Sequence, residues 1–398
     1  MTSETLKARD GILGQIISAA GRRLMPRAVA GGITITLPSG RQHRWGHEKP
    51  GITCDLQLRN YKPLWNGFRR GSNGFAESFM AGDIETSNLT AFMRFYLQNR
   101  PALDEAARPI FHRSPSDRLF HLLRPNTRAG ARRNIHAHYD LGNAFYAQWL
   151  DKTMSYSSAY FGGGAKSLEA GQIAKYRLVL DALALSQPSD ILEIGCGWGG
   201  FAETAAEQGH RVTGLTISEE QLAYARQRMG QRAEIRFQDY RDTQGQFDAI
   251  ASIEMIEAVG EANWPTYFKV LHDRLKPGGT AAVQAITISE ALYPRYRRKA
   301  DFIQRYIFPG GMLPTKTILA EQAARAGLSF GVHQTFGQDY ARTLDLWHKQ
   351  FEAAWPSISP LGFDEAFRRR WRYYLCYCEA GFAEASIDVG VYKFTRMA

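Results

Sequence analysis

The feature that most constrains the fold is a regular alternation of strand-like and helix-like segments between residues 186 and 286. The strand-like segments are short apolar runs, at 190–195, 211–217, 233–239, 247–253 and 280–286. Between them lie segments with helical periodicity, at 200–209, 218–229 and 261–275. Strands that alternate with helices form a parallel sheet with right-handed crossovers. We therefore predict an α/β domain with a doubly wound, mostly parallel sheet.

The N-terminal part of the chain has a different pattern. Residues 11–25 have the spacing of an amphipathic helix, 33–37 and 52–60 read as strands, and 75–99 reads as helix. The stretch from Pro101 to Arg133 is rich in proline, arginine and polar residues. We predict a small α+β domain over 1–115, a linker over 116–133, and the larger domain over 134–398.

A glycine-rich turn follows the first strand of the alternating region. Gly195, Gly197 and Gly199 stand where strand gives way to helix, with Glu193 two residues before the first glycine. Glycines allow a ligand to approach the backbone, and a helix N-terminus presents free N–H groups. The spacing GxGxGG differs from the dinucleotide pattern GxGxxG, and the next strand ends in Thr216-Ile-Ser218 rather than in an acid.

This combination resembles the class I S-adenosylmethionine (SAM)-dependent methyltransferases, which have a seven-stranded sheet. Within them, long matches in one order resemble the cyclopropane fatty-acyl-phospholipid synthases and their fatty-acid-methylating relatives. The matching segments are HYDLGNAFYAQWLDKTMSYSSAYF (138–161), LEIGCGWGG (192–200), VTGLTISEEQ (212–221), QDYRD (238–242), IEMIEAVG (253–260) and QRYIFPGG (304–311). The resemblance covers roughly residues 70–398, and the N-terminal part resembles that family's small lipid-associated domain more weakly.

The resemblance implies a SAM site. It places Tyr156 and Ser157 near the SAM carboxylate and the glycines from Gly195 to Gly199 beneath the ribose and methionine portion. It places Thr216 and Gln221 at the ribose, and Asp239 and Tyr240 at the adenine. An alternative for Thr216 and Gln221 is a role in helix capping, with Ser218 as the cap itself.

The resemblance also implies how the proton is removed. In the cyclopropane synthases of this family the acceptor is a bound bicarbonate, held by a Cys, a Glu, a His, a Tyr and a backbone group. The matching positions here are Ser158, Glu257, Gln284, Tyr340 and the backbone of Ile286. Because Ser and Gln replace Cys and His, and Gln cannot carry a proton, the use of bicarbonate is in doubt.

A second departure lies at Glu254, where many bacterial cyclopropane synthases carry Gly. If Glu254 and Glu257 share a helical face at i, i+3, two nearby carboxylates raise one pKa and suit acid–base work. We predict that Glu254 or Glu257 takes part in proton removal. The alternative is that Glu254 is an ordinary polar residue at the end of a strand. The stretch EMIEAVG (254–260), together with Ser157 and Ser158, resembles relatives that make methylated or methylene chains, although plant-type cyclopropane synthases carry a similar stretch. This resemblance implies a methyl-branched or methylene acyl chain rather than a cyclopropane.

Other candidates come from the C-terminal region. Cys378 matches a cysteine described as catalytic in the family, with a structural or pocket-lining role as the alternative. Aromatic side chains are candidates for stabilising a cation, or simply for core positions; they are Tyr160, Phe161, Trp371, Tyr373, Tyr374, Tyr377 and Phe382.

Composition bears on partners and compartment. The net charge of +10 indicates an anionic partner, and basic residues gather at 118–133 and 293–305. We expect acidic phospholipid rather than nucleic acid, a cytoplasmic protein peripheral to the membrane's inner face, and a homodimer by resemblance only. The four cysteines have no metal-ligand spacing, and for His136, His138 and Asp140 we predict no metal. Rival classes are a methyltransferase for nucleic acid or a small metabolite, and a non-catalytic lipid-binding relative.

Overall fold

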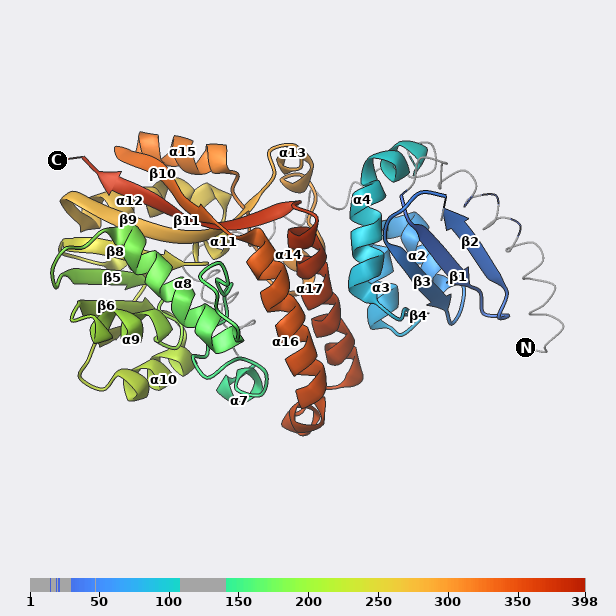
Figure 1. Ribbon diagram of the computed structural model, residues 1–398, viewed down its shortest axis with the longest axis horizontal. Coiled ribbons are helices and arrows are strands. Elements are labelled where there is room, and N and C mark those ends of the chain that lie inside the picture. The colour runs from blue at the N-terminus through green and yellow to red at the C-terminus, as the bar shows by residue number, and fades with distance from the viewer. Residues whose placement is uncertain are drawn as a thin grey trace. The chain divides into compact units, whose positions relative to one another are not determined.

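The computed structural model describes residues 30–46, 48–107 and 141–397, together with isolated positions 15, 19 and 21 (Figure 1). The chain divides into two compact units. Unit 1 comprises Met1–Asp117 and Gly362–Glu384, and unit 2 comprises Arg118–Leu361 and Ala385–Ala398. Among the described residues, no helix is long and apolar enough to cross a membrane.

Unit 1 is built on a four-stranded mixed sheet in the order β2-β1-β3-β4. Its strands are β1 (Gly32–Thr36), β2 (Gln42–Gly46), β3 (Thr53–Leu58) and β4 (Ile84–Glu85). Strand β1 runs antiparallel to β2 and parallel to β3. The helices in its N-terminal segment are α2 (Lys62–Arg70), α3 (Ser72–Met80) and α4 (Leu89–Ala107). Alternate residues of β3 enter the core, where Leu56 and Leu58 pack with Ile33 and Phe95.

Helix α17 (Glu365–Ala383) belongs to unit 1, although the sequence-based division placed all of 134–398 in one domain. The Tyr373 ring lies 5.7 Å from that of Phe79, and Arg369 pairs with Glu85. The Thr90 hydroxyl donates to Glu379 at 2.8 Å. A ring contact with α3, an ion pair with β4 and a hydrogen bond with α4 therefore join α17 to the first unit.

Unit 2 contains a seven-stranded sheet in the order β10-β11-β9-β8-β5-β6-β7. The strands are β5 (Asp190–Ile194), β6 (Arg211–Thr216), β7 (Glu234–Phe237), β8 (Phe247–Ile253), β9 (Leu275–Ile288), β10 (Leu328–Thr335) and β11 (Ile387–Arg396). Only β11 runs antiparallel to its neighbours, β9 and β10. This topology confirms the predicted doubly wound, mostly parallel fold.

Helices flank the sheet of unit 2. They are α7 (Asn143–Tyr146), α8 (Leu168–Leu183), α9 (Gly200–Glu207), α10 (Glu219–Met229), α11 (Ile256–Val259), α12 (Trp264–Arg274), α13 (Tyr293–Tyr296), α14 (Phe302–Tyr306), α15 (Lys316–Arg325) and α16 (Gly337–Ile358). Short 3-10 turns are η1 (Tyr240–Asp242), η2 (Glu261–Asn263) and η3 (Ser359–Leu361). Helix α8 crosses the sheet on the face toward the viewer in Figure 1. The core between α12, α15 and the sheet contains Phe268, Leu271, Leu319 and Phe394.

Several predicted boundaries need correction. The single helix predicted at 75–99 is two helices, α3 and α4, separated by β4, and strand β2 was not predicted. Pro101, taken as the start of a proline-rich stretch, lies inside α4. The strand predicted at 280–286 begins earlier, at Leu275, because residues 276–279 also lie within β9, where the pairing with β8 shifts register. The predicted linker 116–133, its basic residues, most of the helix predicted at 11–25 and the triplet at 136–140 lie outside the described residues.

Candidate functional site

The predicted site residues follow successive parallel strands. Gly195 comes directly after β5, Thr216 ends β6, Asp239 follows β7 and Glu254 follows β8. The carboxyl ends of parallel strands meet at one edge of the sheet, and β5 lies between β8 and β6, where the strand order reverses. Ligands of open α/β sheets bind at this point.

The glycine-rich turn has the backbone conformation that requires glycine. Gly195, Gly197 and Gly199 have φ values of 82°, 52° and 86°. The amides of Gly195 and Cys196 both donate to the carbonyl of Leu215, at 3.1 and 2.8 Å, which fixes the turn to β6. A Cβ atom on Gly197 would meet no other atom within 4 Å. The turn therefore exposes backbone to a ligand at the start of α9.

The residues after β6 form a hydrogen-bonded group. Ser218 is the N-cap of α10 and accepts from the Gln221 amide, as the capping alternative held. The Thr216 hydroxyl donates to the Gln221 side chain at 2.9 Å and accepts from the Ser218 amide at 3.1 Å. Thr216 and Gln221 therefore hold each other in place, and their contact with ribose remains a prediction.

The residues predicted at the adenine lie in η1. Asp239 accepts from the amide and from the guanidinium of Arg241, which also lies 5.6 Å from the centre of the Tyr240 ring. Burial raises the pKa of Tyr240 to about 12, so its hydroxyl stays protonated. Asp239 thus has a strong cationic partner already, although each carboxylate oxygen accepts more than one hydrogen bond.

Tyr156 and Ser157 lie in an extended segment next to α8 and α16. The Tyr156 ring belongs to an aromatic cluster, with centroids 5.3 Å from Trp347 and 5.7 Å from Trp149. The Ser157 hydroxyl accepts from the Lys175 ammonium at 2.6 Å. The SAM contacts of both residues remain predictions.

Lys175 is a candidate that sequence reasoning missed. It is fully buried on α8, and its ammonium lies 4.0 Å from the centre of the Tyr176 ring. Burial lowers its pKa to about 8, against the opposing effect of negative charge on Glu254, Asp151 and Glu193. The signal was present in the sequence, because Lys175 falls on the buried stripe of α8 at i, i+3 and i, i+4 spacing.

The central feature of the site is the carboxylate of Glu254, which is held by three donors. Its Oε1 accepts from the Ser158 amide and from the Gln284 side chain, both at 2.8 Å. Its Oε2 accepts from the Tyr340 hydroxyl at 2.6 Å. Three segments distant in the sequence thus converge on one buried carboxylate.

The backbone of Glu254 is also unusual. Its φ is 49°, in the left-handed region that favours glycine, and its amide donates to the carbonyl of Gln284 at 2.8 Å. Such a conformation in a non-glycine residue costs about 1–2 kcal/mol and persists where the surroundings fix it. Glu254 is therefore outside α11, which begins at Ile256, and the predicted helical face shared with Glu257 is wrong.

Burial dominates the electrostatics of both carboxyl groups. It raises the pKa of Glu254, while the hydrogen bonds from Tyr340 and Ser158, together with the charge of Lys175, act in the opposite direction. Burial and the negative charge of Glu254 raise the pKa of Glu257 to about 8. Burial acts on both groups, but only Glu254 has three hydrogen-bond donors and the charge of Lys175, which favour its carboxylate form relative to that of Glu257.

The predicted bicarbonate ligands are arranged differently from expectation. Ser158 directs its amide to Glu254, while its hydroxyl donates to the carbonyl of Ala159. Glu257 accepts from the Ile286 amide at 2.5 Å, and its other oxygen is buried without a hydrogen-bond partner among the described residues. The Ser158, Gln284 and Tyr340 donors are engaged by the side chain of Glu254.

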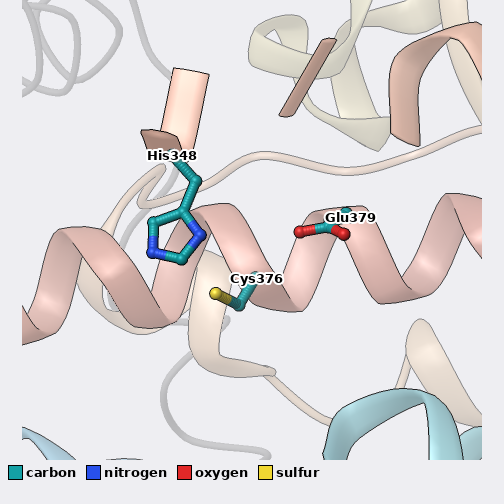
Figure 2. A group of neighbouring side chains, drawn as sticks. All are labelled: His348, Cys376 and Glu379. Atoms are coloured by element: carbon teal, nitrogen blue, oxygen red, sulfur yellow. The ribbon is translucent and has the colours of Figure 1, made fainter. Parts of the chain in front are cut away.

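Cys378 is not among the residues that unit 2 brings together, since it lies on α17 in unit 1. Figure 2 shows two neighbours of Cys378 on the same helix, Cys376 and Glu379; His348, also drawn there, lies on α16 of unit 2. Of the aromatic residues of α17, Tyr373 lies against Phe75 and Phe79 of unit 1, and Trp371 stacks on Phe367 of the same helix. Within unit 2 the sequence missed Trp347, whose ring lies 6.1 Å from that of Tyr340.

Comparison with known proteins decides the family. The model of the family described as mycolic acid cyclopropane synthetase matches residues 126–392. The chain belongs to this family. The tuberculostearic acid methyltransferase UfaA1 of Mycobacterium tuberculosis is 39% identical over 351 residues, covering 82% of this chain and 79% of its own. The cyclopropane-fatty-acyl-phospholipid synthase of Escherichia coli K12 is 35% identical over 353 residues, covering 86% of this chain and 88% of its own.

Solved structures agree with this membership of the cyclopropane synthetase family. The mycolic acid cyclopropane synthase CmaA1, complexed with SAH and CTAB, has 30% identity and a TM-score of 0.62, covering 69% of this chain and 100% of that chain. Coclaurine N-methyltransferase, at 17% identity and a TM-score of 0.58, shares the fold alone. The protein is a SAM-dependent methyltransferase, and the glycine turn at 195–199 fits that cofactor because it leaves the backbone accessible.

The glycine requirement gives a first prediction. In Gly195→Ala the new Cβ would lie 3.1 Å from Cγ of Met255, at a φ of 82° that alanine disfavours. We expect SAM affinity to fall by about tenfold or more, since strain of about 1–2 kcal/mol falls on the binding turn. Isothermal titration calorimetry with SAM checks this. Gly331→Ala, on β10 with open space at its Cβ, is the matched control and keeps the wild-type affinity.

Proposed function

We propose that this protein methylates the double bond of an unsaturated acyl chain in a phospholipid, with Glu254 as proton acceptor, giving a methyl-branched or methylene chain. The observation that carries the proposal is the carboxylate of Glu254, which is buried and held by Ser158, Gln284 and Tyr340. The relatives named above include a tuberculostearic acid methyltransferase and a cyclopropane-fatty-acyl-phospholipid synthase. Their names support an acyl chain of a phospholipid as the substrate class.

The reaction requires a base that works without water. SAM supplies an electrophilic methyl group, the alkene provides the electron pair for the new C–C bond, and a carbocation remains on the acyl chain. A proton must then leave the chain, and the electrons of its C–H bond neutralise the cation. A carboxylate in a dry site accepts that proton more readily than one in water, because burial raises its pKa.

Glu254 suits this role better than Glu257. At neutral pH a carboxyl with a pKa of about 8 holds its proton, so Glu257 is not available as a base. Three hydrogen-bond donors and the charge of Lys175 favour the carboxylate form of Glu254 and oppose the effect of burial on its pKa. The hydrogen bonds also fix the direction of its oxygens, which a general base requires.

A bound bicarbonate is not needed in this arrangement. The donors at Ser158, Gln284 and Tyr340 already hold a carboxylate, so a second anion would have to displace a group of the same charge. We propose that the side chain of Glu254 takes the place of the anion that the resemblance implied. Bicarbonate is then no cofactor of this protein.

Aromatic rings adjoin the same site. Tyr156, Trp347 and Tyr340 form a continuous cluster, and Trp347 is fully buried. The faces of such rings attract positive charge and exclude water. We propose that this cluster shields the carbocation until its proton has moved.

The phospholipid substrate places the protein at a membrane surface with anionic lipid, which we propose is the cytoplasmic face. The net charge of +10 supports this, as do the exposed Arg295 in α13 and the exposed Arg297 and Arg298 directly after it. Arg297 pairs with Glu261 at 2.8 Å, so the charge of Arg297 is partly neutralised. An electrostatic contribution of this kind weakens as salt rises.

A cyclopropane is the alternative product, supported by the likeness to the Escherichia coli synthase. The products differ in which proton leaves. Loss from a chain carbon leaves the transferred methyl intact as a branch, whereas loss from the methyl group itself gives a cyclopropane or a methylene.

The test is mass spectrometry of phospholipid acyl chains after incubation with purified protein and SAM whose methyl group is fully deuterated. We expect either a methyl branch, which retains all the deuterons of the methyl group, or a methylene, which retains two of the three; a cyclopropane would contradict the proposed product. A product that has lost one deuteron indicates a methylene or a cyclopropane, which chain fragmentation separates. No labelled acyl chain from any unsaturated phospholipid would refute the proposed activity.

A further inference from the structure

Helix α2 of unit 1 is amphipathic, but its apolar side chains are exposed and its other side packs against the protein. Leu64, Trp65 and Phe68 lie within about 100° of one another around the helix and are 39%, 60% and 53% exposed. The opposite side packs inward: Pro63 is buried, and the Asn66 amide donates to the Ser78 hydroxyl at 3.0 Å. A surface helix normally turns its apolar stripe to the core. In α2 the apolar stripe faces solvent.

Basic side chains border this apolar stripe. Lys62 and Arg69 are exposed on its edge, and α2 carries no acidic residue. The Arg69 guanidinium lies 5.7 Å from the centre of the Trp65 ring, which in turn stacks on Phe68 at 6.1 Å. Arg70 faces elsewhere and is paired with Glu77 at 2.7 Å. The exposed surface of α2 thus combines two stacked aromatic rings with the positive charges of Lys62 and Arg69, which pair with no acidic group in the part of the chain that the structure describes.

This combination fits a lipid bilayer. Tryptophan is favoured at the membrane interface, where its ring enters the apolar region while its edge remains among polar groups. Lysine and arginine at the rim of an apolar helical face contact lipid phosphates. A second copy of the chain fits less well, because each copy carries a net charge of +10 and has positive charge at this surface.

We propose that α2 is a membrane-docking element, which inserts Leu64, Trp65 and Phe68 among the acyl chains while Lys62 and Arg69 contact anionic headgroups. The inference deepens the proposed function and rests on it in one respect: docking brings the protein to the phospholipid that it methylates. The docking itself is a property of unit 1 and requires no catalysis.

The test measures binding separately from methylation. Wild type and the double variant Trp65→Ala/Phe68→Ala are sedimented with vesicles of diphytanoyl phosphatidylcholine and diphytanoyl phosphatidylglycerol, whose chains are fluid and contain no double bond. Because two exposed aromatic anchors are lost, we expect vesicle binding to fall by about tenfold or more. Leu361→Ala removes an exposed apolar side chain in unit 2 and serves as the control with unchanged binding.

A charge variant and an activity assay complete the design. Lys62→Glu/Arg69→Glu should bind vesicles containing phosphatidylglycerol less well than wild type, with little change on pure phosphatidylcholine. Turnover of an unsaturated phospholipid in detergent micelles should be unchanged in the aromatic variant, which shows that the fold and the active site are intact. If that substrate is not methylated by wild type, the proposed function fails while the vesicle result still decides the role of α2.

Two results would overturn the docking proposal. One is wild-type vesicle binding by the aromatic variant, which would show that α2 does not anchor the protein. The other is a change from dimer to monomer in analytical ultracentrifugation on substituting Trp65 and Phe68, which would assign the surface to a second copy of the chain.

Discussion

Glu254→Gln should abolish most of the turnover while leaving the fold and the affinity for SAM unchanged. Glutamine keeps an oxygen to accept from the Ser158 amide, and the Tyr340 hydroxyl can turn to accept from the new amide group. It cannot accept a proton. Removal of a general base typically costs about 10²–10⁴ in rate, and we expect a loss in this range. Steady-state turnover of an unsaturated phospholipid, with calorimetry of SAM binding, measures both quantities.

The substitution Glu257→Gln distinguishes the catalytic role of Glu257 from that of Glu254. Because burial and the charge of Glu254 raise the pKa of Glu257 to about 8, the substitution resembles the protonated form already present at neutral pH. We expect it to lower turnover by less than about tenfold. A larger loss in Glu257→Gln than in Glu254→Gln would assign the base to Glu257 and contradict the account.

Lys175→Met should have the largest effect on stability. The Lys175 ammonium is fully buried among the negative charges of Glu254, Asp151 and Glu193. Removing one member of a buried charge group leaves the others without compensation and typically costs about 3–5 kcal/mol. Urea denaturation followed by circular dichroism measures the loss. Lys152→Met, at an exposed position next to Asp151, is the matched control and should change the free energy of unfolding little.

The same substitution should move the pH profile of kcat/KM in a defined direction. The reaction needs the deprotonated form of Glu254, so the rate rises as pH increases through the pKa of that group. The positive charge of Lys175 lowers that pKa, and its removal raises it. The acidic limb of the profile therefore moves to higher pH in Lys175→Met. An unchanged acidic limb in a folded variant would show that Lys175 has no influence on the catalytic base.

The sheet of unit 2 could be predicted because its signal is local. Apolar strands at 190–195 and 247–253 and the glycines that follow the first of them specify a parallel sheet and a ligand-binding turn without knowledge of distant residues. Glu254 could be singled out by its position at the end of β8. Its partners could not, because Ser158, Gln284 and Tyr340 reach it from segments 30 to 96 residues away.

Other features depend on packing that sequence periodicity does not reveal. Helix α17 has the composition of an aromatic core helix, yet which core it joins is decided by contacts such as those of Tyr373 with Phe79. The helical pairing proposed for Glu254 and Glu257 failed because a left-handed residue precedes α11. The helical spacing of the sequence places Lys175 on one stripe of α8 and Trp65 on one stripe of α2. Only the structure shows that the first stripe is buried and the second exposed.

The most direct test of Glu254 as a built-in base is the dependence of turnover on bicarbonate in wild type and in Glu254→Gly. Glycine accepts the φ of 49° at this position, and its lack of a side chain leaves the Ser158, Gln284 and Tyr340 donors free for an anion. In buffers stripped of carbon dioxide we predict full turnover by wild type and almost none by Glu254→Gly, with partial recovery of the variant when bicarbonate is added. Loss of wild-type turnover on removal of bicarbonate, restored by its return, would show that a bound anion rather than Glu254 accepts the proton.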